Sequence, residues 1–268
     1  MQTRRQFIRR AIQAGMVLGS PQIIVRASPG IRTTRSAGAT TNNKKAVSAG
    51  GGGGDTTTGL IGWWKLDDGS GGTAVDSSAS GNNGTLVNSP SWISGRVGTG
   101  ALSFASASSQ VVTANTTALS SLSKATLAGW INRTSTSNKM ALGAGSIGQA
   151  SRFNFIWYSD GNIYFDYGMS NSSAYAFCAL TGTGWHHAAL VFDGTLTGNA
   201  RITAYIDGVL KTLSYNSTPP TNLDSSANLG NFLIGKEVAN GYSDGSADDV
   251  CIYNRPLVQA DITALASM

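Results

Sequence analysis

The stretch "ARITAYIDGVLKTLSY" (residues 200–215) decides the fold class. Ile202, Ala204 and Ile206 alternate with larger or more polar residues, which is typical of an antiparallel strand with one buried face. Asp207-Gly208 follows directly, and this dipeptide is a strong indication of a two-residue hairpin turn. "VLKTL" then supplies a returning strand, so the stretch predicts a β-hairpin.

Short apolar stretches separated by Gly, Ser, Asn and Asp recur from residue 59 onward. "YSDGNIYF" (158–165) repeats the hairpin pattern at Asp160-Gly161, and "WHHAALVF" (185–192) is apolar on both faces apart from its histidines, which predicts a central strand. The chain has 34 glycines and only 12% charged residues, which suits an all-β domain. We therefore expect an antiparallel β-sandwich with jelly-roll architecture over residues 59–268.

Only the C-terminal stretch "PLVQADITALASM" (256–268) has a helical pattern. Leu257, Ile262 and Leu265 can share one stripe of a helix. We expect this helix to pack against the edge of the sandwich.

The positive net charge of +5 lies in the N-terminal segment rather than in the predicted domain. Residues 1–54 hold nine Lys or Arg and no acid; residues 55–268 hold ten basic and fourteen acidic residues, a net charge of −4. A nucleic-acid partner needs clustered positive charge on the folded domain, so the sequence argues against one.

Residues 1–27 contain the Arg4-Arg5 pair, a short and weakly apolar core, and "VRA" (25–27) with small residues at the positions that signal peptidase reads. They resemble a bacterial twin-arginine (Tat) signal peptide; the alternative is an ordinary amphipathic N-terminal helix. Residues 28–58, which include five consecutive glycines at 50–54, predict a flexible, disordered linker. The resemblance implies export by the Tat pathway to the periplasm, the cell surface or the medium, with no membrane span after signal removal.

Three motifs occur in order along the chain: "GWWKLDDGSGGTAVDSSASGNNGTLVNSPSWISGRVGTGALSF" (62–104), "WHHAALVFDG…ARITAYIDG" (185–208) and "DGSADDVCIYNRPLVQADITAL" (244–265). This ordered set resembles the laminin-G-like jelly-roll domains of the concanavalin A-like lectin/glucanase superfamily. The resemblance covers nearly all of residues 59–268 and implies the concanavalin A-like fold. It is weak evidence for activity, because this fold carries lectins, enzymes and adhesive modules.

Oxygen-rich side chains in the first and last motifs suggest a structural calcium ion. Because the ends of a jelly roll often meet, Asp76, Asp248 and Asp249, with Asn83, could surround a hard cation, which takes about six to eight oxygen ligands. Related jelly rolls often carry such an ion, so the resemblance points the same way. The alternative is that these residues cap turns.

Cys178 and Cys251 are the only cysteines. They could form a disulfide in an oxidising compartment. Two buried free thiols explain the sequence at least as well, because free Cys is a common small core residue.

The sequence argues against catalysis. Glycosidases need two carboxyl groups beside the scissile bond, and the glucanases of this superfamily use a closely spaced E-x-D-x-x-E strand, which a chain with Glu237 as its only glutamate lacks. No G-x-S-x-G elbow is present. His186 and His187 are the only histidines, and neighbours on a strand point to opposite faces.

Binding remains the favoured function. Aromatic and hydrogen-bonding residues gather in the middle strands, as in many sugar sites, although core packing would explain each aromatic too. The candidate ligand-binding residues are Trp157, Tyr158, Tyr164, Tyr167, Asn154 and Asp166, with Tyr175 and Asn171 beside them. Alternation places Tyr158 on the face opposite Trp157. We therefore expect an exported, non-catalytic module that binds a glycan or envelope polysaccharide; the alternatives are a structural or protein-interaction domain that contacts other envelope proteins and, less favoured, a glycoside hydrolase.

Overall fold

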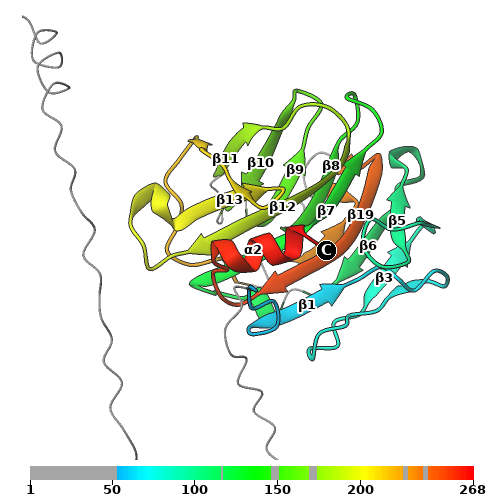
Figure 1. Cartoon of the computed structure of the whole chain (residues 1–268), viewed down its shortest axis with the longest axis horizontal. Helices are drawn as coiled ribbons and strands as arrows, with labels where there is room; N and C mark the ends of the chain where they lie inside the picture. The colour runs from blue at the N-terminus through cyan, green and yellow to red at the C-terminus, as the bar shows by residue number, and fades with distance from the viewer. Residues whose placement is uncertain (1–52, 116, 146–150, 169–173, 226–228, 238–240) are drawn as a thin grey trace, which may run out of the picture. The chain divides into compact units, whose positions relative to one another are not determined.

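The computed structural model describes residues 53–115, 117–145, 151–168, 174–225, 229–237 and 241–268. These residues form two antiparallel sheets packed face to face as a β-sandwich (Figure 1), which confirms the predicted fold class. The segment predicted to be a signal peptide and most of the predicted linker lie outside the described residues. Within the described part, the helices are too short or too polar to cross a membrane.

The first sheet has its strands in the order β14-β13-β12-β7-β19-β5-β4, with β1 also paired to β19. The bounds are β14 (Val209–Leu210), β13 (Ile202–Ile206), β12 (Gly184–Asp193), β7 (Lys124–Arg133), β19 (Gly245–Tyr253), β5 (Ala101–Phe104), β4 (Ser91–Ile93) and β1 (Leu60–Trp64). β12 lies inside the sheet between β13 and β7, as its two apolar faces predicted.

The second sheet has the order β15-β11-β10-β9-β8-β16-β6-β3-β2. The bounds are β15 (Ser214–Tyr215), β11 (Tyr175–Ala179), β10 (Asn162–Asp166), β9 (Arg152–Trp157), β8 (Met140–Gly145), β16 (Asn231–Ile234), β6 (Val111–Ala114), β3 (Gly84–Val87) and β2 (Thr73–Ala74). A separate two-stranded ribbon pairs β17 (Lys236–Glu237) with β18 (Gly241–Tyr242). Short 3-10 turns span Ser106–Ser108, Thr117–Leu119 and Gly198–Arg201.

The hairpin predicted at residues 200–215 is present. β13 and β14 pair through Ile206↔Val209, which leaves only Asp207 and Gly208 in the turn. Both turn residues have positive φ angles, 52° and 75°, as a type I′ turn requires. The second predicted hairpin joins β9 to β10, but its turn is longer: Gly161 donates its N–H to the Tyr158 carbonyl.

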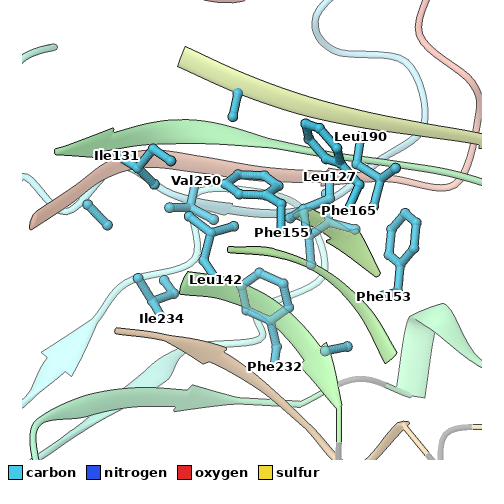
Figure 2. Packing of buried hydrophobic residues seen from close by; sticks show 14 of the residues in the cluster. Leu127, Ile131, Leu142, Phe153, Phe155, Phe165, Leu190, Phe232, Ile234 and Val250 are labelled. Atoms are coloured by element: carbon cyan, nitrogen blue, oxygen red, sulfur yellow. The ribbon is translucent and has the colours of Figure 1, made fainter. Parts of the chain in front are cut away.

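The hydrophobic core fills the space between the sheets (Figure 2). Leu127 and Leu190 come from the first sheet, and Phe153, Phe155 and Phe165 come from the second. The Phe155 and Phe165 rings meet edge to face at 6.2 Å. Each such side chain contributes about 1.5–3 kcal/mol by leaving water, so the inward residues of β9 and β10 fix the orientation of both strands.

The helix α2 (Gln259–Ala266) packs on a face of the sandwich, so the prediction that it packs at the edge was wrong. Figure 1 shows it across the outer face of the first sheet. Its Ile262 and Leu265 join a second cluster with Ala128 and Ala189 of the central strands. The physical reason is that these strands expose an apolar outer face that requires a cover.

The opening and closing strands lie side by side, as predicted: β1 pairs with β19, with Trp64 opposite Val250. A β-bulge interrupts the β19–β7 pairing between Asp248 and Cys251. Asp249 sits in the bulge with a φ of 48°, in the left-handed region. The bulge turns the two adjacent carboxylates toward different partners.

Candidate functional site

The candidate site lies on the outer face of the second sheet, over β9, β10 and β11. Alternation along β9 sends Phe153, Phe155 and Trp157 into the core. The intervening residues Arg152 and Ile156 therefore face outward, as does Tyr158 just beyond the strand. This confirms the prediction that Tyr158 and Trp157 lie on opposite faces.

Four aromatic rings gather on this outer face. Tyr164 is at the centre: its ring centroid lies 5.4 Å from that of Tyr158, 5.5 Å from that of Tyr175 and 5.4 Å from that of Phe177. Each of these residues is half-buried. The Tyr164 hydroxyl donates to Asp160 Oδ2 at 2.7 Å, and this hydrogen bond raises the pKa of Tyr164 to about 12. The hydroxyl therefore stays protonated at neutral pH.

A pocket of about 220 Å³ opens beside these rings. Its lining residues are Arg152, Ile156, Tyr158, Tyr164, Asp166, Tyr175 and Glu237. We call it the tyrosine pocket. It combines aromatic surface with a few fixed polar groups, which is the usual make-up of a small-ligand site.

Two carboxylates anchor the polar groups of the tyrosine pocket. Asp166 Oδ2 lies 3.4 Å from Arg152 Nη1. Glu237 Oε2 accepts a hydrogen bond from the Tyr158 hydroxyl at 2.5 Å and lies 3.4 Å from Lys139 Nζ. The carboxylates are 6% and 1% exposed, so they hold Arg152 and Tyr158 in place from beneath.

Burial raises the pKa of Asp166 to about 7; Arg152 opposes this shift, and the nearby Glu237 carboxylate adds to it. Removing a carboxylate from water disfavours its charged form, and a single ion pair offsets only part of that cost. Asp166 therefore changes charge near neutral pH.

The structure brings together some predicted site residues and corrects others. Tyr158, Tyr164 and Asp166 line the tyrosine pocket, together with Tyr175. Trp157 does not: it is fully buried, and its Nε1 donates to the Leu180 carbonyl at 2.6 Å.

Tyr167 is also a core residue, 1% exposed, with its hydroxyl bonded to the Ser217 carbonyl. Both aromatics fail as site residues because they face the space between the sheets. Asn154 shares the outer face but is 3% exposed and lies next to the pocket. Asn171 lies outside the described residues.

Sequence reasoning missed Arg152 and Glu237. Arg152 could have been found, because it occupies the same alternation phase as Tyr158 in "RFNFIWY" (152–158). Glu237 could not, because it comes from β17, a separate ribbon more than seventy residues along the chain.

The four predicted calcium ligands do not form one cluster. The Asp76 carboxylate accepts hydrogen bonds from the backbone N–H groups of Trp63, Ser78 and Asn82, each at 2.8 Å. Asn83 Oδ1 accepts from the Asp76 N–H at 2.9 Å. Both residues thus cap their own loop, which is the alternative that the sequence left open.

Asp248 and Asp249 face N–H donors too. Asp248 Oδ2 accepts from the backbone N–H groups of Arg96 and Val97 at 2.7 and 2.8 Å, and Asp249 Oδ1 accepts from Trp63 Nε1 at 2.5 Å. In the described part of the chain, no three His, Cys, Asp or Glu side chains are placed to hold a metal ion. The residues do not fit a calcium site, and calcium binding by this chain remains an untested prediction.

The possible disulfide is absent. Cys178 and Cys251 are both free thiols. Cys178 lies on β11 of the second sheet, whereas Cys251 faces the helix on the outer side of the first. The two sheets of a sandwich are about 10 Å apart, so these side chains cannot meet.

Solved structures with similar folds include domain 4 of the extracellular arabinanase AbnA from Geobacillus stearothermophilus, in complex with arabinotriose. It has a TM-score of 0.53 and 16% identity, covering 77% of this chain and 98% of that one. A Trypanosoma rangeli sialidase in complex with sialic acid has a TM-score of 0.55 and 16% identity, covering 78% of this chain and 33% of the sialidase.

The binding domain of botulinum neurotoxin DC, in complex with rat synaptotagmin II, has a TM-score of 0.55 and 12% identity; the match covers 80% of this chain and 52% of that one. At these identities the likeness shows the fold alone. No curated protein matches the chain by sequence. The family model of the concanavalin A-like lectin/glucanases superfamily matches residues 104–263, more than half of the chain, and the chain therefore belongs to this family.

Proposed function

We propose that this chain is a non-catalytic carbohydrate-binding module whose ligand sits in the tyrosine pocket. The observation that carries the proposal is the combination of three half-buried tyrosine rings with a fixed arginine in one pocket. Aromatic rings pack against the apolar faces of sugars, while fixed polar groups meet the sugar hydroxyls.

The polar contacts beneath the pocket orient the groups that would contact the ligand. The Tyr158 hydroxyl donates a hydrogen bond to Glu237, which fixes the position of its ring and its oxygen at the pocket wall. Arg152 is oriented by Asp166 and donates to sugar oxygens. The two carboxylates thus act as positioning groups.

The same burial argues against hydrolysis. A glycosidase carboxyl group must touch the scissile bond to protonate or attack it. Although both line the pocket, Glu237 and Asp166 are only 1% and 6% exposed and are engaged by Tyr158 and Arg152, which argues against their acting on a glycosidic bond. We therefore propose binding without turnover.

The experiment is a glycan and polysaccharide array probed with the full chain, with product analysis for hydrolysis. Tyr175→Ala removes one wall of the pocket and should abolish the signal. Trp92→Ala is the matched control, because Trp92 is a half-buried aromatic on β4 of the other sheet. Binding that survives Tyr175→Ala, or released product, would contradict the proposal.

Two of the three similar structures support the sugar ligand by analogy, because they are complexes with sugars. The third holds a protein, and it supports the second candidate, a protein-interaction domain. One observation of this chain favours that candidate: Val209 and Leu210 on the edge strand β14 are 58% and 53% exposed. The protein-interaction candidate would become the better account if two results were obtained together. The glycan array would show no binding, and the chain would bind an envelope protein in a way that Leu210→Asp abolishes.

We also propose that the chain is exported by the Tat pathway and acts in the periplasm, at the cell surface or in the medium. The twin-arginine motif at Arg4-Arg5 supports this.

A further inference from the structure

A second pocket lies on the same outer face of the second sheet. It measures about 280 Å³ and is lined by residues of β6, β8, β16 and β17, among them Thr113, Asn231, Leu233 and Lys236. We call it the leucine pocket. Its lining is mainly apolar but includes the amide of Asn231, the hydroxyl of Thr113 and the ammonium group of Lys236. It therefore combines apolar surface with a few polar groups, as the tyrosine pocket does.

The strand register places the two pockets on one line. Residues paired across successive strands form a row that runs straight across the sheet. This central row is Tyr175, Asp166, Asn154, Gly143, Leu233 and Thr113. Tyr175 and Asp166 line the tyrosine pocket, and Leu233 and Thr113 line the leucine pocket.

The floor between the pockets carries only small side chains on β8. The outward residues of this strand are Ala141, Gly143 and Gly145, since Met140, Leu142 and Ala144 enter the core. Gly143 has a φ of 138°, and a Cβ there would lie 2.3 Å from the Asn154 Cα. Only glycine fits at this point of the row, so no side chain rises from it.

Two adjacent residues of β17 each line a different pocket. Lys236 and Glu237 are adjacent on β17, and Lys236 lines the leucine pocket while Glu237 lines the tyrosine pocket. On the row itself, Asn154 Oδ1 is buried without a donor among the described residues.

We propose that the ligand is an extended oligosaccharide that occupies both pockets at once, an inference that rests on the proposed function. Asp166 and Leu233 are three strand intervals apart, about 14 Å at the usual spacing of strands. This exceeds the width of one sugar ring, so a single sugar unit cannot fill both pockets. The site thus selects chains over single sugars.

The test is calorimetric titration of the full chain with arabino-, xylo- and cello-oligosaccharides of one to six units. For the series that binds, affinity should rise at least tenfold as the chain grows from one to about four units. Leu233→Ala should cancel this gain while leaving the affinity for the shortest binder unchanged. Asn231→Ala, at an exposed position of the same pocket, should reduce the gain at least threefold without threatening the fold.

Tyr175→Ala should abolish the binding of short and long ligands alike. An affinity that does not depend on length, or two leucine-pocket variants that leave the gain intact, would overturn the two-pocket inference while the proposed function stands. No binding at any length, with an empty glycan array, would overturn the proposed function itself and this inference with it.

Discussion

The charge of Asp166 should make the stability of the domain depend on pH. Its pKa rises from 3.8 to about 7 on folding because burial disfavours the carboxylate. The folded state therefore holds the proton more tightly than the unfolded state. This contribution to stability is fully present below pH 4 and is lost as the pH rises through about 7.

The magnitude follows from the size of the shift. About three pKa units correspond to an upper value of about 4 kcal/mol between pH 4 and pH 8. Asp166→Asn cannot titrate and should remove this dependence. Arg152 loses its ion-pair partner in the variant, and this adds a constant cost to the variant because asparagine does not titrate.

The assay is urea unfolding of wild type and Asp166→Asn at half-unit steps from pH 4 to pH 8. The difference between the two curves isolates Asp166, because Asp248, whose pKa burial raises to about 6, and His187, whose pKa burial lowers to about 4, titrate in both proteins. The difference should change by about 2–4 kcal/mol across the range, in favour of the variant at high pH. Parallel curves would refute the reasoning.

Three further predictions follow from the contacts. Asp76→Ala should lower the free energy of unfolding by about 3 kcal/mol in urea titrations, because the backbone N–H groups that donate to this carboxylate would lose their acceptor. A loss below about 0.5 kcal/mol would contradict this prediction. Because Asp76, Asp248 and Asp249 face N–H donors, EDTA should leave the thermal midpoint unchanged and added calcium should not raise it, whereas a shift of several degrees would restore the calcium hypothesis. Replacing Arg4 and Arg5 by lysine should block export of a fused reporter in a Tat-competent host, and unimpaired export would count against the signal assignment.

The fold was predictable because its determinants are local. The alternation of Ile202, Ala204 and Ile206 and the Asp207-Gly208 turn need only neighbouring residues to act. The position of the helix was not predictable, because it depends on which strands present an apolar outer face.

The candidate site was predictable only in part, for the same reason. Alternation along the strand predicted that Tyr158 and Trp157 lie on opposite faces of the sheet. It did not predict which face is buried, because that depends on the packing of the opposite sheet. Glu237 reaches the pocket through the path of β17, which no spacing in the sequence reveals. The paired acids Asp248 and Asp249 suggested a metal because a bulge and its N–H donors leave no mark on the sequence.

The most direct test of the central claim is a crystal structure of the full chain soaked with the oligosaccharide that binds best on the array. The account predicts sugar density in the tyrosine pocket, against the rings of Tyr158, Tyr164 and Tyr175, with Arg152 within hydrogen-bond distance. Sugar bound elsewhere, with the tyrosine pocket holding only water, would contradict it.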